Sequence, residues 1–505
     1  MSSSNPVARL VAGLADPARR RGAALWFVLG YSVLWLIYGI IAKSSQDLNA
    51  DMAEMVVWTR ELALGYPKHP PLLAWILWAW FSVFPLADWA YLVLSVITVA
   101  AGIYLAIELC AEWLEGEKLA AVPFLLAAIP FYNFLGLKWD QNSILIPLWA
   151  LAMWAMLRAL DTRGWGWAAT AALAAAAAML SKYWSAFLIV AMALTALIHP
   201  RRREYFRSSA PWVTTLVFIA AIAPHAWWLV RENFPPITWV VTRRAAVSLG
   251  GTLQSIAESF GGTFAYASIA MGLVVAFVRP NMAAIADSWR WPRDERRTAA
   301  MLFWVPLALP VVPSLAKGIT LISLWNTPAL NLLPVMMLAS PLVVVTRQMV
   351  ERIAYAITAI TLLVVIASPV IGYAILKRGV ENDAAYARLL MQEAEAEWRA
   401  ATGKPLKMIG GPFVLVSTAA FYGADKPSTF ADFSPYLSPW ASPERVARDG
   451  MVVMVANDSP WFDYTRDKLK SYPNARPVKE ITLTRKWLWF DSAPRRFQIT
   501  VVPPK

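Results

Sequence analysis

The chain has 505 residues, of which 58% are hydrophobic and only 16% are charged. Soluble proteins keep about a quarter of their residues charged, so this composition excludes a string of soluble domains and predicts a membrane protein. The net charge of +13 would suggest nucleic acid in a soluble protein. Basic cytoplasmic loops explain it better here, and we expect no nucleic-acid partner. The single cysteine, Cys110, excludes a disulfide framework.

Apolar runs without charge recur along the chain at about the 20-residue length that a helix needs to cross a bilayer. Eleven such runs lie between Arg21 and Lys43, Asp88 and Glu108, Lys118 and Lys138, Asp140 and Arg158, Arg163 and Lys182, Lys182 and Arg201, Arg207 and Arg231, Glu258 and Arg279, Arg297 and Lys317, Lys317 and Arg347, and Arg352 and Lys377. The first is too long for a signal-peptide core and lacks a small-residue cleavage site, so we expect an uncleaved helix. The predicted fold class is an α-helical polytopic membrane protein with about eleven transmembrane helices.

The basic loops orient the predicted helices. Alternating the runs from a cytoplasmic amino terminus places three arginine clusters on the same side, namely 19–21, 201–207 and 290–297. Cytoplasmic loops carry an excess of Lys and Arg, so this side is the cytoplasm. An odd number of spans then leaves the carboxy terminus outside. We therefore expect a multi-pass protein of the bacterial inner (plasma) membrane whose carboxy-terminal domain is periplasmic.

The composition changes at Lys377, which predicts two domains. Residues 1–376 form the transmembrane domain, with a first periplasmic loop over 43–85, and residues 377–505 form a small periplasmic α/β domain. A polar helix is expected over 382–402. Strand-like runs, bounded by Gly, Pro and Asp turns, follow at Phe413–Val416, Met451–Val455 and Phe497–Val501.

The first periplasmic loop holds the most informative polar residues. Asp47, Asp51 and Glu54 fall within eight residues, and in a helix Asp51 and Glu54 share a face. A glycine- and proline-rich turn over 65–71 follows. The apolar run from Pro71 to Phe84 is too short to span and is expected along the membrane interface. A solvated acidic loop with a proline turn would explain the same residues without chemistry.

Other polar residues stand at the outer ends of the predicted spans. They are Lys138 to Asn142, Ser181 to Tyr183, Pro224-His225, Arg243-Arg244, Lys317 and Trp325-Asn326. Each alone could snorkel or cap a helix, but together they put carboxylates and cations on one membrane face. That combination suits sugar transfer from a lipid phosphate, since cations can neutralise the leaving phosphate and a carboxylate can take the acceptor's proton. A cytosolic nucleotide sugar could not reach this face, so the donor would be lipid-linked.

At these residues the chain resembles the GT-C membrane glycosyltransferases, in the bacterial branch (family 39) related to protein O-mannosyltransferases and the lipid A aminoarabinose transferase. The most specific similarity is the first-loop stretch over 51–72, which runs D-x-x-E, then W, then G-Y-x-x-H-P-P-L. Weaker matches follow in family order through about the first 330 residues: W-D-Q-N-S at 139–143, L-S-K-Y at 180–183 and A-P-H-A-W at 223–227.

The resemblance implies an inverting hexosyl or pentosyl transfer from a polyprenyl-phosphate sugar to a lipid, glycan or protein acceptor, with the first-loop Asp as general base. Carried onto this sequence, it makes Asp51, Asp140 and Glu54 the catalytic carboxylates. The candidates for binding the donor phosphate are Lys68, His69, Lys182, Arg244 and His225. The family commonly has an Asp-Glu pair where Met52 follows Asp51 here. The distance to Gly65-Tyr66 favours Asp51 as the general base, but Glu54 stays open as the base or as a partner that raises the pKa of the base.

The sequence indicates no required cofactor. His69 lies near carboxylates and could bind a divalent metal ion, but such a histidine more often only forms hydrogen bonds. The main alternative function is a transporter or flippase of a lipid-linked sugar, which would use many of the same cations. The polar residues cluster at one face rather than at the midplane, and no internal repeat is visible, which disfavours this alternative. A signalling receptor would need a cytoplasmic output domain, which the sequence lacks.

Overall fold

The computed structural model describes residues 5–245, 248–378 and 383–505. The chain forms two compact units, each assembled from separate stretches of sequence. The first unit, which is almost entirely helical, comprises Met1–Leu36, Lys68–Leu72 and Leu94–Leu363. The second unit comprises Ile37–Pro67, Leu73–Val93 and Val364–Lys505. Most of the first predicted loop therefore belongs to the same unit as the carboxy-terminal domain.

Seven helices among the described residues are long and apolar enough to cross a membrane. They are α2 (Arg20–Lys43), α5 (Asp88–Cys110), α7 (Leu145–Thr162), α11 (Ala210–Arg231), α13 with its π-helical continuation (Leu249–Val278), α15 with α16 (Arg296–Lys317) and α18 (Arg347–Arg378). Each coincides with one of the predicted runs. Only 6% of the most apolar window of α11 is buried inside the protein, against 67% for α7, so α11 mainly faces lipid. The chain is a polytopic helical membrane protein, as predicted.

The other four predicted runs form shorter elements. The run before Lys138 folds as α6 (Gly116–Ala127) and two 3-10 turns, η1 (Pro130–Tyr132) and η2 (Leu135–Leu137). The two runs that meet at Lys182 fold as α8 (Trp165–Ser181) and α9 (Ser185–Ile198). The run before Arg347 folds as η4 (Ser323–Leu332) and α17 (Leu333–Leu338). A count of eleven spans stays a prediction.

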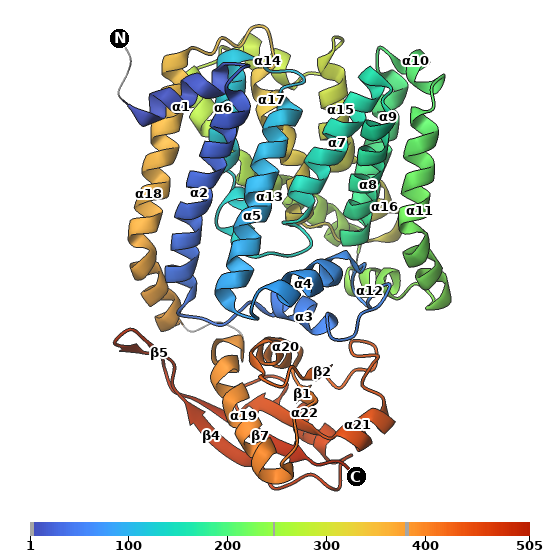
Figure 1. Cartoon of the computed structure of the whole chain (residues 1–505), viewed down its shortest axis with the longest axis vertical. Coiled ribbons are helices and arrows are strands. Elements are labelled where there is room, and N and C mark those ends of the chain that lie inside the picture. Colours follow the sequence, from blue (N-terminus) through green and yellow to red (C-terminus); the bar gives the residue numbers. More distant parts are fainter. Residues whose placement is uncertain (1–4, 246–247, 379–382) are drawn as a thin grey trace. The chain divides into compact units, whose positions relative to one another are not determined.

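Within the first unit, α7, α8, α9 and α11 lie side by side (Figure 1). The three arginine clusters lie next to α1 (Pro6–Ala15), α10 (Arg202–Phe206) and α14 (Met282–Trp289), which Figure 1 shows at the same end of this unit. The short helix α12 (Pro235–Arg243) lies at the opposite end. The helical unit therefore has a basic end, as the charge pattern predicts.

The second unit contains a five-stranded sheet with strand order β2-β1-β3-β7-β4. The strands are β1 (Met408–Gly411), β2 (Ser428–Ala431), β3 (Met451–Ala456), β4 (Lys479–Leu483) and β7 (Arg495–Val502). β1 runs parallel to β2 and β3, whereas β7 is antiparallel to β3 and β4. β3 is buried along its whole length, which fits a central strand covered on both faces. The helices of this domain are α19 (Ala387–Thr402), α20 (Phe413–Tyr422), α21 (Pro443–Asp449) and α22 (Phe462–Leu469).

The predicted small α/β domain is confirmed, but one of its predicted strands is wrong. The runs at Met451–Val455 and Phe497–Val501 lie in β3 and β7, whereas Phe413–Val416 begins the helix α20. Parallel neighbours such as β1 and β2 need a crossover, and α20 is the helix between them. A short apolar run cannot by itself distinguish a buried strand from a buried helix. The polar helix is confirmed as α19, and residue 382 of its predicted range lies outside the described residues.

Candidate active site

The turn that carries Asp140 is held tightly between η2 and α7. The indole of the fully buried Trp139 donates to the hydroxyl of Thr98 over 2.9 Å. One carboxylate oxygen of Asp140 accepts from the backbone N–H groups of Asn142 and Ser143, at 2.8 and 3.2 Å. The other accepts from the side-chain amide of Asn142 at 3.3 Å and lies 3.9 Å from Lys138 Nζ. Asp140 therefore fixes this turn by capping its backbone, and its charge faces the cations around it.

Lys182 lies between α8 and α9 and points toward this turn. Its Nζ atom donates to Oδ1 of Asn142 over 2.6 Å. Burial lowers the pKa of Lys182 to about 7, while the attraction of Asp140 raises it and the charge of Arg244 lowers it further. The structure thus brings together Asp140 and Lys182, two of the predicted site residues from distant parts of the chain.

Lys182 and Arg244 share one aromatic side chain, Trp325. Lys182 Nζ lies 4.7 Å from the centroid of the Trp325 ring, and the guanidinium carbon of Arg244 lies 5.5 Å from the same centroid. Trp184 packs edge-on against Trp325 with a centroid separation of 5.0 Å. The backbone carbonyl of Arg244 accepts from the N–H of Thr320 over 2.8 Å. Two cations that share one indole form a site that an anion would stabilise, because the anion would relieve their repulsion.

A second pair of cations shares the ring of Trp239. Lys68 Nζ is 5.2 Å from the ring centroid of Trp239, and the guanidinium carbon of Arg243 is 4.8 Å from it. Arg243 ends α12 and Arg244 follows it directly, so the two pairs are joined by adjacent residues. The predicted residues Lys68, Lys182 and Arg244 therefore belong to two cation pairs, which are linked through the peptide bond between Arg243 and Arg244. The sequence placed Arg243 and Trp325 at the outer ends of the spans without assigning them to the phosphate site, and it did not indicate Trp239.

The two predicted histidines have different environments. His225 is buried in α11, and its Nε2 atom lies 2.8 Å from the hydroxyl of Tyr183. Its ring also stacks on Trp228 with a centroid separation of 5.7 Å. His225 thus supports the residue next to Lys182, whereas contact with a phosphate stays a prediction. His69 is half-buried next to Lys68.

Asp51 and Glu54 lie in the second unit, on the short helix α3 (Ala50–Trp58). The side chain of Asn49 caps this helix by accepting from the N–H of Asp51 over 3.0 Å. Asp51 is exposed in the first turn, whereas the side chain of Glu54 is buried. The positive end of the helix dipole stabilises a carboxylate in the first turn. The two carboxylates are therefore not equivalent.

The Gly65-Tyr66 motif has a packing role in the same unit. The ring of Tyr66 stacks on Trp58 with a centroid separation of 4.7 Å and an interplanar angle of 9°. Its hydroxyl donates to the carbonyl of Trp58 over 3.0 Å. The motif therefore closes the loop back onto the end of α3.

The loop around α3 is bound to the carboxy-terminal domain by buried charges. Asp47, which precedes α3, accepts from Arg485 Nη1 over 2.6 Å and from the backbone N–H of Arg388 over 3.1 Å. Arg60, which follows α3, donates to the carbonyls of Ala420 and Pro427, the first at 2.8 Å. α3 itself packs against α20. Both ends of the helix that carries Asp51 are thus fixed within the second unit.

One further ion pair completes this attachment. Glu61 accepts from Arg445 Nη1 over 2.6 Å and from the hydroxyl of Ser428 over 2.6 Å.

Among the residues that the structure describes, no group of three or more His, Cys, Asp or Glu side chains could hold a metal ion. The structure therefore places no set of metal ligands around His69 among these described residues, and a metal ion at His69 stays an untested alternative.

The sequence is similar to known glycosyltransferases. Residues 68–228 match the family described as dolichyl-phosphate-mannose-protein mannosyltransferase. The chain is 26% identical over 297 residues to the lipid A galacturonosyltransferase RgtD of Rhizobium johnstonii, covering 57% of the chain and 59% of that relative. It is 26% identical over 322 residues to the lipopolysaccharide core galacturonosyltransferase RgtA of the same organism, covering 61% and 62%. The chain thus matches about three fifths of the length of either relative.

The fold extends the similarity to nearly the whole chain. The crystal structure of ArnT from Cupriavidus metallidurans, bound to undecaprenyl phosphate, superposes with a TM-score of 0.61. The match covers 94% of this chain and 98% of that one at 14% sequence identity, so it establishes the fold alone. The chain is therefore a polytopic membrane protein with the fold of the ArnT structure, and parts of its sequence are similar to the protein mannosyltransferase family and to these two galacturonosyltransferases.

Proposed function

We propose that this protein is a membrane glycosyltransferase that transfers a sugar from a polyprenyl-phosphate donor to an acceptor hydroxyl. The relatives are named for galacturonosyl transfer to lipid A and to the lipopolysaccharide core, and the ArnT structure holds undecaprenyl phosphate. These names make a glycolipid the first acceptor to test and a uronic acid the first sugar. The observation that carries the proposal is that Lys182 and Arg244 flank Trp325 as a pair of cations.

The proposed reaction is a single displacement that inverts the anomeric carbon. The acceptor oxygen forms the new bond to this carbon while the bond to the donor phosphate oxygen breaks, and the electron pair leaves on the phosphate. Lys182 and Arg244 bind that phosphate and neutralise its growing charge. Lys68 and Arg243, joined to them through adjacent residues, extend the basic surface. Asp140 holds the turn to which Lys182 is bonded.

A carboxylate takes the acceptor's proton, and we assign this role to Asp51. Its exposure in the first turn of α3 keeps the carboxylate accessible to an acceptor hydroxyl. Glu54 is buried one turn later, which suits a supporting role better than contact with an acceptor.

The charge pattern supports a reaction on the periplasmic side. The arginine clusters next to α1, α10 and α14 share one end of the helical unit, and α12 with Arg243 lies at the other (Figure 1). The positive-inside rule assigns the end with the three arginine clusters to the cytoplasm. The amino terminus is then cytoplasmic, and the basic cluster around Trp325 faces the periplasm.

The test is to incubate the purified protein in nanodiscs with several polyprenyl-phosphate sugars and with lipid A, and to analyse the lipids by mass spectrometry. The proposal predicts a glycolipid product whose mass increases by one sugar residue, together with release of polyprenyl phosphate. Movement of the donor between leaflets without any product would instead indicate a flippase. The Asp51→Asn variant separates the two further, because a flippase should retain its rate.

A further inference from the structure

A small β-hairpin in the carboxy-terminal domain ends in two large apolar residues. Its strands are β5 (Lys486–Trp487) and β6 (Phe490–Asp491), and Leu488 and Trp489 form the turn between them. The side chains of these two residues are 56% and 79% exposed. Leu488 has a φ of +52°, a conformation that glycine or asparagine adopts at lower cost. The turn therefore contains bulky apolar residues where polar flexible ones would fold more easily.

The base of the hairpin is fixed to the ends of two membrane-spanning helices. The ring of Trp487 lies against Gly372 of α18, where a Cβ atom would come within 2.8 Å of it. The indole nitrogen of Trp487 donates to the hydroxyl of Ser44, directly after the last residue of α2, over 2.7 Å. Only a glycine at position 372 leaves room for this ring.

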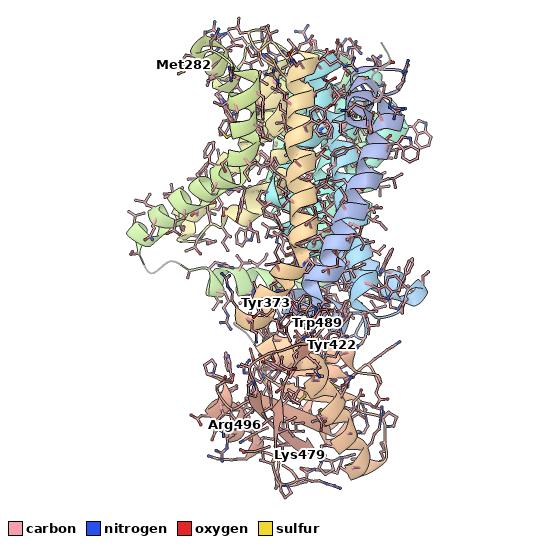
Figure 2. The ribbon with its side chains drawn as sticks, turned by 90° about the vertical axis from the view of Figure 1, so that its left-hand side faces the viewer. Met282, Tyr373, Tyr422, Lys479, Trp489 and Arg496 are labelled. Carbon is pink, nitrogen blue, oxygen red and sulfur yellow. The ribbon has the colours of Figure 1, made fainter. Side chains whose placement is uncertain are left out.

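The second strand of the hairpin contacts the last turns of α18. The ring of Phe490 lies 4.6 Å from that of Tyr373, measured between centroids. Lys377 Nζ donates to the carbonyl of Asp491 over 3.1 Å. Figure 2 shows Tyr373 and Trp489 at the end of α18. The tip is thus held at the level where the apolar span of α18 gives way to Lys377 and Arg378.

We infer that Leu488 and Trp489 insert into the interfacial layer of the lipid bilayer and anchor the carboxy-terminal domain to the membrane surface. Indole rings concentrate where lipid headgroups meet acyl chains, because one part of the ring is apolar and its N–H is polar. The exposed Lys486 beside them suits lipid phosphates. The occupant is lipid rather than another protein, because the surface continues directly from two helices that themselves end at the bilayer. This inference does not depend on the proposed enzymatic activity.

The test uses a fluorophore at the hairpin tip. The Trp489→Cys variant is labelled with a polarity-sensitive dye in nanodiscs of phosphatidylethanolamine and phosphatidylglycerol, with the unsubstituted protein as a blank because Cys110 is buried. The matched control is Lys470→Cys, whose native side chain is 79% exposed after α22. Lipids with a doxyl group near the headgroup should quench the dye at position 489 at least about threefold more than at position 470. An aqueous nickel chelate should show the opposite preference.

Two results would overturn the inference. Equal quenching at positions 489 and 470 by both reagents would show that the tip stands in water. Protection of position 489 from both the lipid and the aqueous quencher would show that protein covers it. Because position 489 is on the surface, its substitution should not disturb folding, and an unchanged gel-filtration profile checks this.

Discussion

Lys182 Nζ donates a 2.6 Å hydrogen bond to the side chain of Asn142, 40 residues earlier in the chain. This bond joins the turn fixed by Asp140 to the junction of α8 and α9. It leaves the ammonium group beside Trp325, together with Arg244. The hydrogen bond between Lys182 and Asn142 thus holds the Lys182 ammonium group in the same basic site as Arg244.

The lowered pKa of Lys182 predicts a pH dependence of donor binding. The protonated form predominates below about 7 and the neutral amine above it. Because only the cation attracts phosphate, we expect the KM for the donor to rise as the pH increases through about 7. A Lys182→Arg variant keeps its charge over this range and should show a flat profile. A wild-type KM that falls with rising pH would contradict this role.

Removing either cation should weaken donor binding more than it affects folding. We expect Lys182→Met and Arg244→Gln each to raise the KM for the donor by about 10- to 100-fold, since a charge-assisted contact contributes about 1.5–3 kcal/mol. The matched control is Arg231→Gln, at an exposed position beside Glu232 at the end of α11. Steady-state kinetics with varied donor measures the effect. An equal change in the control would show that general surface charge, rather than this site, is responsible.

The buried pair of Asp47 and Arg485 should be important for the stability of the second unit. Asp47→Asn leaves the Arg485 guanidinium buried without its counter-charge, which should cost about 3–5 kcal/mol. The double variant Asp47→Asn/Arg485→Gln should recover part of that loss, because neither charge is then left alone.

The midpoint of thermal unfolding in detergent micelles measures this effect. Asp458→Asn is the control, because that carboxylate pairs with Arg495 at an exposed position and should contribute less than about 1 kcal/mol. Equal shifts for Asp47→Asn and Asp458→Asn would contradict the assigned importance of the buried pair.

Hydrophobicity predicted the membrane fold well because long spans need only length and an absence of charge. It could not predict where apolar runs break. Pro130 interrupts the run that follows Lys118, and Pro328 and Pro334 lie in the run that becomes η4 and α17. Proline removes a backbone donor and disfavours a continuous helix. The four residues from Phe413 were mistaken for a strand because a short apolar run has no decisive period.

The site was predictable only in part. Motif order indicated Asp140 and Lys182, and the structure brings them together through Asn142. The pairing of Asp47 with Arg485 joins residues 438 positions apart, and no local pattern could indicate it. Likewise, the shared faces of Trp325 and Trp239 depend on how helices pack. The sequence gives residue types, whereas the partners come from the tertiary fold.

The most direct test of the proposed function is the turnover of Asp51→Asn beside Glu54→Gln, measured by mass spectrometry of the glycolipid product. We predict that Asp51→Asn lowers turnover by about 100-fold or more while the affinity for the donor is unchanged, because only proton removal is lost. Glu54→Gln should retain much more activity. Wild-type turnover in Asp51→Asn would contradict the assignment of Asp51 as the general base.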